Sequence, residues 1–96
     1  MNFKEKVYEI VKKIPKGKVT TYKEIGKALN TKAYRAIGTI LKNNPNPIIV
    51  PCHRVINSNL IVGSYKGKQN SKEKIKLLKK EGIGIKNKKV DVKYLI

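Results

Sequence analysis

The sequence has few of the residues that form disulfides and metal sites. It contains one cysteine, one histidine and no tryptophan among 96 residues. A lone cysteine cannot form an internal disulfide, and Cys52 with His53 cannot supply the four ligands of a structural zinc site. We therefore expect neither a metal nor a cofactor.

Long apolar runs are missing as well. No stretch of about 18 apolar residues is present, which argues against a transmembrane span. The N-terminal segment MNFKEKVYEI carries charges where a secretory signal peptide needs an apolar stretch. We expect a protein that has no membrane partner and stays inside the cell.

Acidic residues are also scarce. The chain has 6 Asp or Glu against 23 Lys or Arg, which gives a formal charge of +17. A field of this sign attracts polyanions and favours a phosphate-rich partner such as a nucleic acid. Only Arg35 and Arg54 are arginines, so most of the charge comes from lysine, which suits unspecific phosphate contact. The alternative is that the lysines only maintain solubility or reflect genome bias.

Hydrophobic spacing predicts three helices in the first half of the chain. The first is capped by Asn2 and ends before the Pro-Lys-Gly of residues 15–17. Thr21 and Glu24 form a capping-box pattern, which predicts a second helix over residues 22–29. Thr31 is expected to cap a third helix over residues 32–43. The residues expected on the inner face of this helix are Ala33, Ala36, Ile37, Ile40 and Leu41. Two short helices joined by a tight turn indicate a helix-turn-helix.

The second half of the chain has a different character. The prolines of residues 43–47 exclude a helix there, and the apolar run 48–50 delivers Cys52 to the middle of the domain. Asn70 and Glu73 predict a capped helix over residues 71–81 that is closed by Gly82. The alternation of apolar residues over 90–96 predicts a short strand or a docked extension. We expect a single domain over residues 1–96, mainly α with a small β element and winged-helix-like, containing a helix-turn-helix.

Adjacent Cys52 and His53 make a candidate nucleophile and base. The thiolate is the reactive form of cysteine, and a nearby imidazole or helix end favours it. A catalytic histidine usually needs an orienting partner, and Glu81 is a plausible one because acids are so few. Adjacency alone does not distinguish this arrangement from a buried cysteine beside a satisfied core histidine.

The residues around this pair form a wider pattern. Residues 44–55, NPNPIIVPCHRV, resemble the active-site segment of the O6-alkylguanine-DNA alkyltransferases, also called methylated-DNA–protein-cysteine methyltransferases. Residues 17–22 (GKVTTY) and 32–38 (KAYRAIG) are similar to the helix-turn-helix of that family. Residues 63–67 (GSYKG) and 77–82 (LLKKEG) are similar to its closing loop and last helix. The resemblance extends over the chain and is to the C-terminal catalytic and DNA-binding domain of the family.

This resemblance implies direct repair of DNA in a single-turnover reaction. Cys52 would irreversibly accept a methyl or other alkyl group from O6-alkylguanine. His53 would act as the base through a water molecule, and Glu81 would hold its imidazole. Asn44 would order the turn beneath the site, and Tyr22 would protonate the leaving guanine.

The resemblance also implies how DNA is held. Arg35 would enter the base stack in place of a flipped nucleotide, and the small Ala36 and Gly38 would let the helix approach the minor groove. The expected backbone contacts are Lys23, Asn30 and Ser58, and the expected lining of the guanine pocket is Val55, Tyr65 and Lys66. The partner would be double-stranded DNA that contains O6-alkylguanine, bound by a monomer. The resemblance implies that the protein is located in the cytoplasm, associated with the nucleoid, or in the nucleus if the source is a eukaryote.

The chain departs from the family pattern, and other functions stay open. The N-terminal domain that is common in the family is absent, Lys66 replaces a small residue of some members, and Tyr34 replaces an alanine. A second function is a damage sensor that resembles the alkyltransferase-like proteins, which flip the base without removing the alkyl group and typically lack the acceptor cysteine. A helix-turn-helix regulator with an inert cysteine and a Cys-His hydrolase are further alternatives. Arg35 could instead form a surface ion pair with Glu24 or Glu81.

Overall fold

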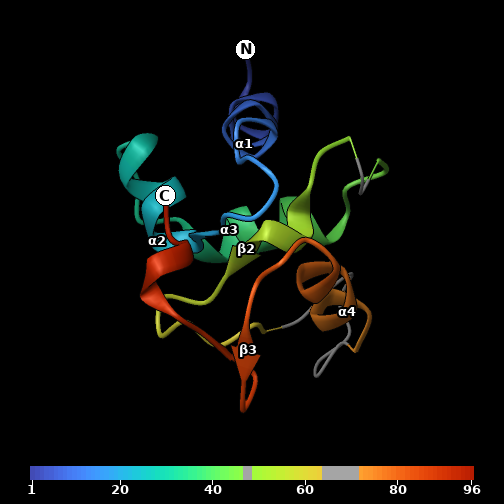
Figure 1. Ribbon diagram of the computed structural model, residues 1–96. Helices are drawn as coiled ribbons and strands as arrows, with labels where there is room; N and C mark the ends of the chain where they lie inside the picture. Colours follow the sequence, from blue (N-terminus) through green and yellow to red (C-terminus); the bar gives the residue numbers. More distant parts are fainter. Residues whose placement is uncertain (47–48, 64–71) are drawn as a thin grey trace.

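The protein is mainly helical with a small amount of β-structure, as the sequence predicts. The computed structural model describes residues 1–46, 49–63 and 72–96. Figure 1 shows the elements of these residues, which follow one another as α1 (Phe3–Lys12), β1 (Thr20–Thr21), α2 (Tyr22–Ala28), α3 (Tyr34–Lys42), the 3-10 turn η1 (Cys52–Arg54), β2 (Val55–Ile56), α4 (Lys72–Lys80), β3 (Ile85–Lys86), β4 (Lys89–Val90) and η2 (Val92–Tyr94). Within these residues no helix has the length and apolarity that crossing a bilayer requires.

Side-chain caps fix where the first two helices begin. The Asn2 side chain accepts a hydrogen bond from the Glu5 amide at 2.8 Å, and Thr21 Oγ1 accepts one from the Glu24 amide at 3.1 Å. Each bond satisfies an amide that has no partner within its helix, so both predicted caps are confirmed.

The predicted start of the third helix is wrong. Thr31 Oγ1 accepts from the Ala33 amide at 3.1 Å, which closes a local turn, and α3 begins at Tyr34. A hydroxyl that bonds two residues ahead competes with the helical cap, so α3 has no side-chain cap. Ala33 and Ala36 are exposed rather than inward-facing, whereas Ile37 and Leu41 are buried as expected.

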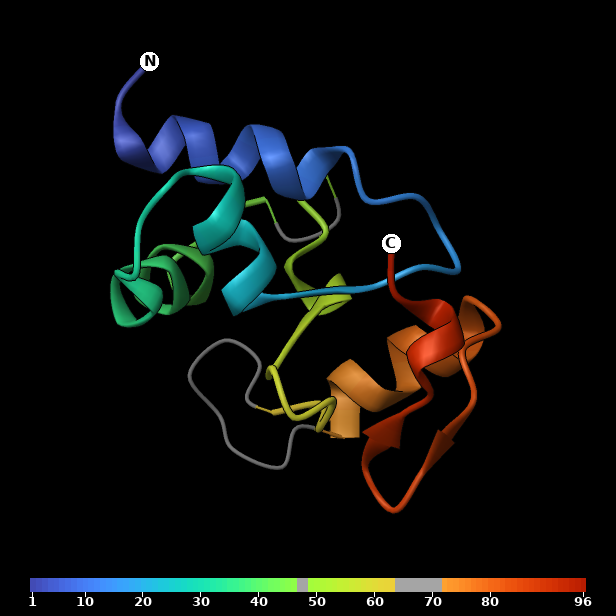
Figure 2. The same ribbon diagram turned by 90° about the vertical axis from the view of Figure 1, so that its left-hand side faces the viewer.

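Two hydrophobic clusters form the core, and the turn η1, which carries Cys52, lies where they meet. The first cluster joins α1, α2, α3 and Cys52, and the second joins Val19 and Ile56 to α4 and the C-terminal segment. Figure 2 shows α1, α2 and α3 on one side, α4 and the β3–β4 hairpin on the other, and the strand after η1 between them. Val55 belongs to the first cluster and Ile56 to the second, because successive strand residues point to opposite faces.

A short parallel pairing connects the helix-turn-helix to η1. β1 pairs with β2 in the register Thr20 to Val55 and Thr21 to Ile56. β1 leads directly into α2, and β2 leaves η1 directly. The first residue of α2, Tyr22, is therefore held at a fixed place relative to the turn that carries Cys52.

The C-terminal segment is a docked extension, one of the two predicted forms. β3 and β4 form an antiparallel hairpin, after which the Val19 amide donates to the Tyr94 carbonyl at 2.9 Å and the Ile96 amide to the Val19 carbonyl at 3.1 Å. Gly82 follows α4 with a φ of +90°, the left-handed conformation that glycine adopts at little cost. Asn70, the expected cap of this helix, lies outside the described residues.

Candidate active site and nucleic-acid interface

The turn η1 is buried, and the segment that leads into it is held by one asparagine. Cys52 is 6% exposed and His53 is 2% exposed. Buried Asn44 donates from Nδ2 to the Val50 carbonyl at 2.7 Å and accepts the Asn46 amide on Oδ1 at 3.0 Å. These bonds connect the segment after α3 to the residues just before Cys52.

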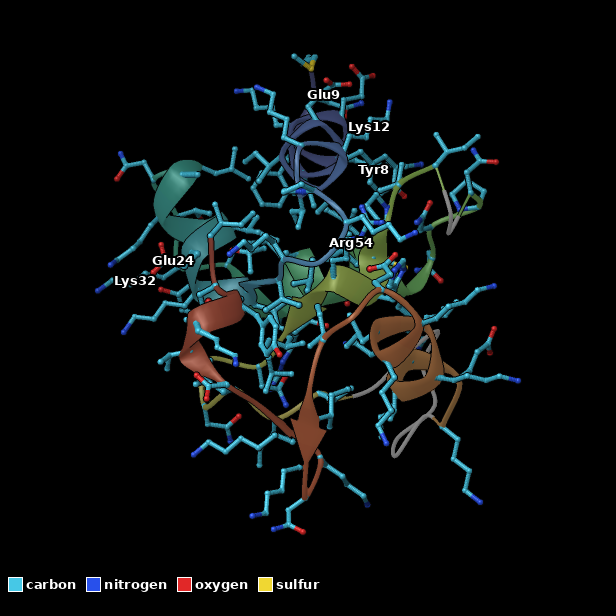
Figure 3. The ribbon with its side chains drawn as sticks, viewed as in Figure 1. Tyr8, Glu9, Lys12, Glu24, Lys32 and Arg54 are labelled. Atoms are coloured by element: carbon cyan, nitrogen blue, oxygen red, sulfur yellow. The ribbon has the colours of Figure 1, made fainter. Side chains whose placement is uncertain are left out.

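Glu81 joins His53 and Arg54 at the end of α4. His53 Nε2 lies 3.0 Å from Glu81 Oε2, and Arg54 donates to both carboxylate oxygens, from Nε at 2.9 Å and from an Nη at 2.7 Å. The other Nη of Arg54 donates to the Ile14 carbonyl at 2.8 Å. Figure 3 shows Arg54 in the middle of the molecule, whereas Glu24 and Lys32 point outward. Arg54 thus binds the end of α4 to the segment that follows α1.

The charge states of this group set the tautomer of His53. Burial alone would raise the pKa of Glu81, but hydrogen bonds from Arg54 and His53 lower its pKa below the usual value. Burial lowers the pKa of His53, and the nearby Glu81 only partly offsets this. A carboxylate can only accept, so the neutral imidazole carries its proton on Nε2. Nδ1 is then the basic nitrogen, and it is buried with no hydrogen-bond partner in the described part of the chain.

Tyr22 lies close enough to Cys52 to sense its charge. Burial raises the pKa of Tyr22, and a negative charge on Cys52 raises it further. The phenol therefore keeps its proton at neutral pH. This proximity follows from the β1–β2 pairing, which positions the start of α2.

An open hollow of about 590 Å³ lies between the helix-turn-helix and the segment after β2. Its lining combines aromatic, cationic and amide side chains with one glycine, and comprises Tyr22, Lys23, Tyr34, Arg35, Gly38, Thr39, Lys42, Asn57, Ser58 and Asn59. Arg35 is exposed, and it forms no ion pair with any acid of the described residues. Glu24 pairs with Lys27 and Glu81 with Arg54, so the alternative of a surface ion pair for Arg35 is wrong.

The remaining predicted contacts lie in different places. Asn30 and Ala36 are exposed but do not line the hollow, and Asn30 has a φ of 54° in the turn between α2 and α3. Asparagine adopts this left-handed conformation more readily than most residues. The backbone of the turn therefore accounts for an asparagine at position 30, whether or not it contacts DNA. Val55 is fully buried in the first core cluster, away from the lining. Tyr65 and Lys66 lie outside the described residues.

Sequence reasoning missed two residues of the site. Arg54, the partner of Glu81, stands out as one of two arginines in a lysine-rich chain, and this signal could have found it. Lys74 donates from its buried Nζ to the Val55 carbonyl at 2.7 Å, and nothing distinguishes it in the run KEKIKLLKK of α4. Among the described residues no three His, Cys, Asp or Glu side chains gather in a way that could hold a metal ion.

Comparison with known proteins identifies the family. The chain is 51% identical over 82 residues to a methylated-DNA–protein-cysteine methyltransferase of Thermococcus sibiricus, covering 84% of this chain and 45% of that protein. It is similar to the O6-methylguanine-DNA methyltransferase of Pyrococcus kodakaraensis, with a TM-score of 0.75 and 44% identity over 86% of this chain and 47% of the other. It is also similar to S. pombe Atl1, solved with damaged DNA that contains O6-carboxymethylguanine, with a TM-score of 0.87 and 31% identity over 98% and 94% of the two chains.

The extent of these matches differs between the relatives. The chain spans about half the length of the curated relatives it matches, but nearly all of Atl1. Both kinds of relative contain the helix-turn-helix-type fold described above. The family model described as 6-O-methylguanine DNA methyltransferase, DNA binding domain, matches residues 2–83, and the chain therefore belongs to this family.

Proposed function

We propose that this protein repairs DNA by moving the alkyl group of O6-alkylguanine to Cys52, once per chain. One observation carries the proposal: the buried Cys52 is followed by His53, whose ring is held by Glu81 at 3.0 Å. The chain then corresponds to the catalytic as well as the DNA-binding part of its longer relatives.

The first step is removal of the thiol proton. With Nε2 donating to Glu81, His53 presents Nδ1 as its basic nitrogen. In the proposed reaction Nδ1 takes the proton of Cys52 through a water molecule, and the ionised Glu81 stabilises the imidazolium that forms. Arg54 holds Glu81 in place and keeps it ionised, because it donates to both carboxylate oxygens.

The second step is displacement at the alkyl carbon. The thiolate sulfur forms a bond to this carbon, the carbon–oxygen bond breaks, and its electron pair stays with guanine. Tyr22 gives its phenolic proton to the guanine ring and recovers one from His53 through solvent, so normal guanine and a neutral thioether result. The thiolate charge that raises the pKa of Tyr22 disappears as the sulfur–carbon bond forms, so the phenol becomes a better acid when the proton is needed.

The DNA is proposed to bind over α3 through its minor groove. The target base must leave the stack to reach Cys52, which costs a few kcal/mol. Arg35 is exposed at the rim of the hollow and has no carboxylate partner, so its guanidinium is available to fill the gap in the stack. Lys23 and Ser58 line the same hollow, which supports the proposal that they contact phosphates. Binding as a monomer is part of the proposal.

Intact mass measurement tests the proposal. One equivalent of duplex with O6-methylguanine should add a single CH2 to the protein, on Cys52, and leave unmodified guanine in the DNA. Cys52→Ser should bind the duplex and gain no mass. Repeated turnover by a small amount of protein would contradict the single-use mechanism, and so would modification of the protein without loss of the lesion.

The second candidate is a damage sensor that flips the alkylated base and leaves it intact. The similarity to Atl1 along nearly the whole of both chains favours it, since that protein was solved with damaged DNA. The same experiment separates the two functions. A sensor would bind the lesion duplex more tightly than the undamaged duplex, and its mass would not change.

A further inference from the structure

Two tyrosine rings cross between the helices of the helix-turn-helix. Tyr22 is the first residue of α2, and Gly26 lies four residues after it. Tyr34 is the first residue of α3, and Gly38 follows at the same spacing, which places each pair on one face of its helix. A Cβ placed on Gly26 would lie 2.4 Å from Cε1 of Tyr34. A Cβ placed on Gly38 would lie 4.0 Å from Cε1 of Tyr22. Each ring therefore lies against the glycine of the other helix.

The glycine of α2 fixes the place of the Tyr34 ring. A Cβ on Gly26 would also lie 2.7 Å from the Thr31 carbonyl oxygen, and real Cβ atoms do not come this close to other atoms. Only glycine therefore lets the Tyr34 ring lie so near the backbone of α2. Tyr34 is half-buried against the first core cluster, and its hydroxyl forms no hydrogen bond with the described residues. Within that part of the chain, packing alone holds the ring.

The part of the Tyr34 ring that α2 leaves uncovered borders the hollow of about 590 Å³. Three cations, Lys23, Arg35 and Lys42, line the same hollow, and among the described residues no acid does. Cations suit the phosphates of a nucleic-acid strand, and aromatic rings suit the flatter and less polar faces of its sugars and bases. A small free anion would use the cations and leave the ring without a partner. The lining therefore favours a strand of nucleic acid.

We propose that Tyr34 is a DNA-contacting residue whose ring packs against a deoxyribose of the strand that carries the lesion. This inference rests on the proposed function, in which Arg35, the next residue of α3, enters the base stack from the minor groove. Sugars form the walls of that groove, so a ring held beside Arg35 meets a sugar before it meets a base. Position 34 is also one of the places where the chain departs from the family pattern. Tyr34 thus adds affinity for the strand and does not touch the alkylated base.

Fluorescence anisotropy with an oligonucleotide that contains O6-methylguanine, single-stranded and in duplex, tests the inference. Tyr34→Ala should weaken binding of both forms roughly tenfold, the effect of losing one aromatic contact to a nucleotide. Tyr34→Phe keeps the ring and should retain most of the native affinity. Free O6-benzylguanine has no sugar, so its reaction with Tyr34→Ala should proceed at the native rate. Native affinity of Tyr34→Ala, or equal slowing with the free base, would overturn the inference.

Two matched variants separate the sugar contact from other roles. Tyr94→Ala removes a half-buried tyrosine whose hydroxyl lies against Gly84, outside this hollow, and it should bind DNA like the native chain. A single strand has no base stack to fill, so Arg35→Ala should lose much less affinity for it than for duplex. If Tyr34→Ala likewise weakens duplex binding alone, Tyr34 only positions Arg35 and makes no contact of its own, which would overturn the inference.

A second measurement covers the case in which Tyr34→Ala does not fold. Tyrosine rings labelled with carbon-13 are observed by NMR in Cys52→Ser, which should bind the oligonucleotide without reacting, and the Tyr34 signal is assigned by its loss in Tyr34→Phe. Nuclear Overhauser effects should connect this ring to deoxyribose protons of the bound strand. Their absence at saturating DNA would overturn the inference. Failure of the proposed function is separate, because it would appear as a native chain that binds the lesion and gains no methyl group.

Discussion

Replacement of Glu81 by glutamine tests how the site is held together. The variant keeps the size of the side chain and removes its charge. Glu81 accepts three hydrogen bonds, two from Arg54 and one from His53, and only 12% of its side chain is exposed. A glutamine amide has one acceptor oxygen, and its NH2 group would face the donors of Arg54 or His53.

The magnitude follows from these contacts. A hydrogen bond to a charged group contributes about 1.5–3 kcal/mol, and loss of one partner of a buried ion pair costs about 3–5 kcal/mol. Arg54 is 16% exposed and keeps its bond to the Ile14 carbonyl, so some of this loss is recovered through water. We expect Glu81→Gln to reduce the free energy of unfolding by about 2–4 kcal/mol. Alkyl transfer should slow by about 10–100-fold, because His53 is no longer held as a base.

Urea denaturation at pH 7 and single-turnover transfer from O6-methylguanine duplex measure the two effects. Glu73→Gln is the matched control, since Glu73 is exposed in the first turn of the same helix. It should cost less than about 1 kcal/mol, the size of a helix-dipole contribution, and leave the transfer rate unchanged. Equal behaviour of the two variants would refute the role of Glu81. Lost stability with a native transfer rate would reduce Glu81 to a structural residue.

Four further predictions address DNA approach and the buried polar groups. Arg35→Ala should strongly slow repair of duplex DNA by raising the cost of flipping by about 1–3 kcal/mol, while reaction with free O6-benzylguanine stays nearly unchanged; equal slowing of both substrates would point to a damaged fold. Gly38→Ala should leave thermal stability intact, because the added Cβ meets no atom nearer than 4.0 Å, but weaken duplex binding in a fluorescence anisotropy titration if α3 lies against DNA. Asn44→Ala should cost about 1–3 kcal/mol in urea unfolding, since it leaves the buried Val50 carbonyl without its donor. Because burial lowers the pKa of His53, the unfolded state binds a proton that the folded state refuses, so the free energy of unfolding should fall as pH drops below about 6.5; a His53→Gln variant should lose this slope.

The sequence predicted the parts of this fold that depend on local chemistry. Thr21 with Glu24 and Gly82 act through neighbours a few residues away, so their signals can be read from the chain. The prediction from Thr31 was wrong because its hydroxyl can either cap a helix or accept the amide two residues ahead. Which bond forms depends on how α3 packs. Glu81 was predicted as the partner of His53 because acids are few and because of the family resemblance, and the structure adds a 3.0 Å contact between His53 Nε2 and Glu81 Oε2.

The contacts between segments that are distant in the chain could not be predicted from the sequence. The strands β1 and β2 are far apart in the chain and pair in parallel. Each has only two residues, which is too short to show a periodic pattern of hydrophobic residues in the sequence. The burial of Lys74 follows from the docking of α4 against η1, and in the sequence it is one lysine among many. Arg54 is a partial exception. It stands out in the sequence as one of two arginines, but the sequence does not show that it pairs with Glu81.

During synthesis Cys52 leaves the ribosome before α4 does. Residues up to Val55 contain the whole first hydrophobic cluster apart from the Leu77 that packs against it, so the helix-turn-helix can begin to condense around the cysteine early. Glu81 is made later and arrives only when α4 docks on the second cluster through Leu78. On the proposed mechanism the newborn chain therefore carries an ordinary thiol. In that mechanism it gains its single-use reactivity only when α4 docks, after the helices proposed to bind DNA have been made.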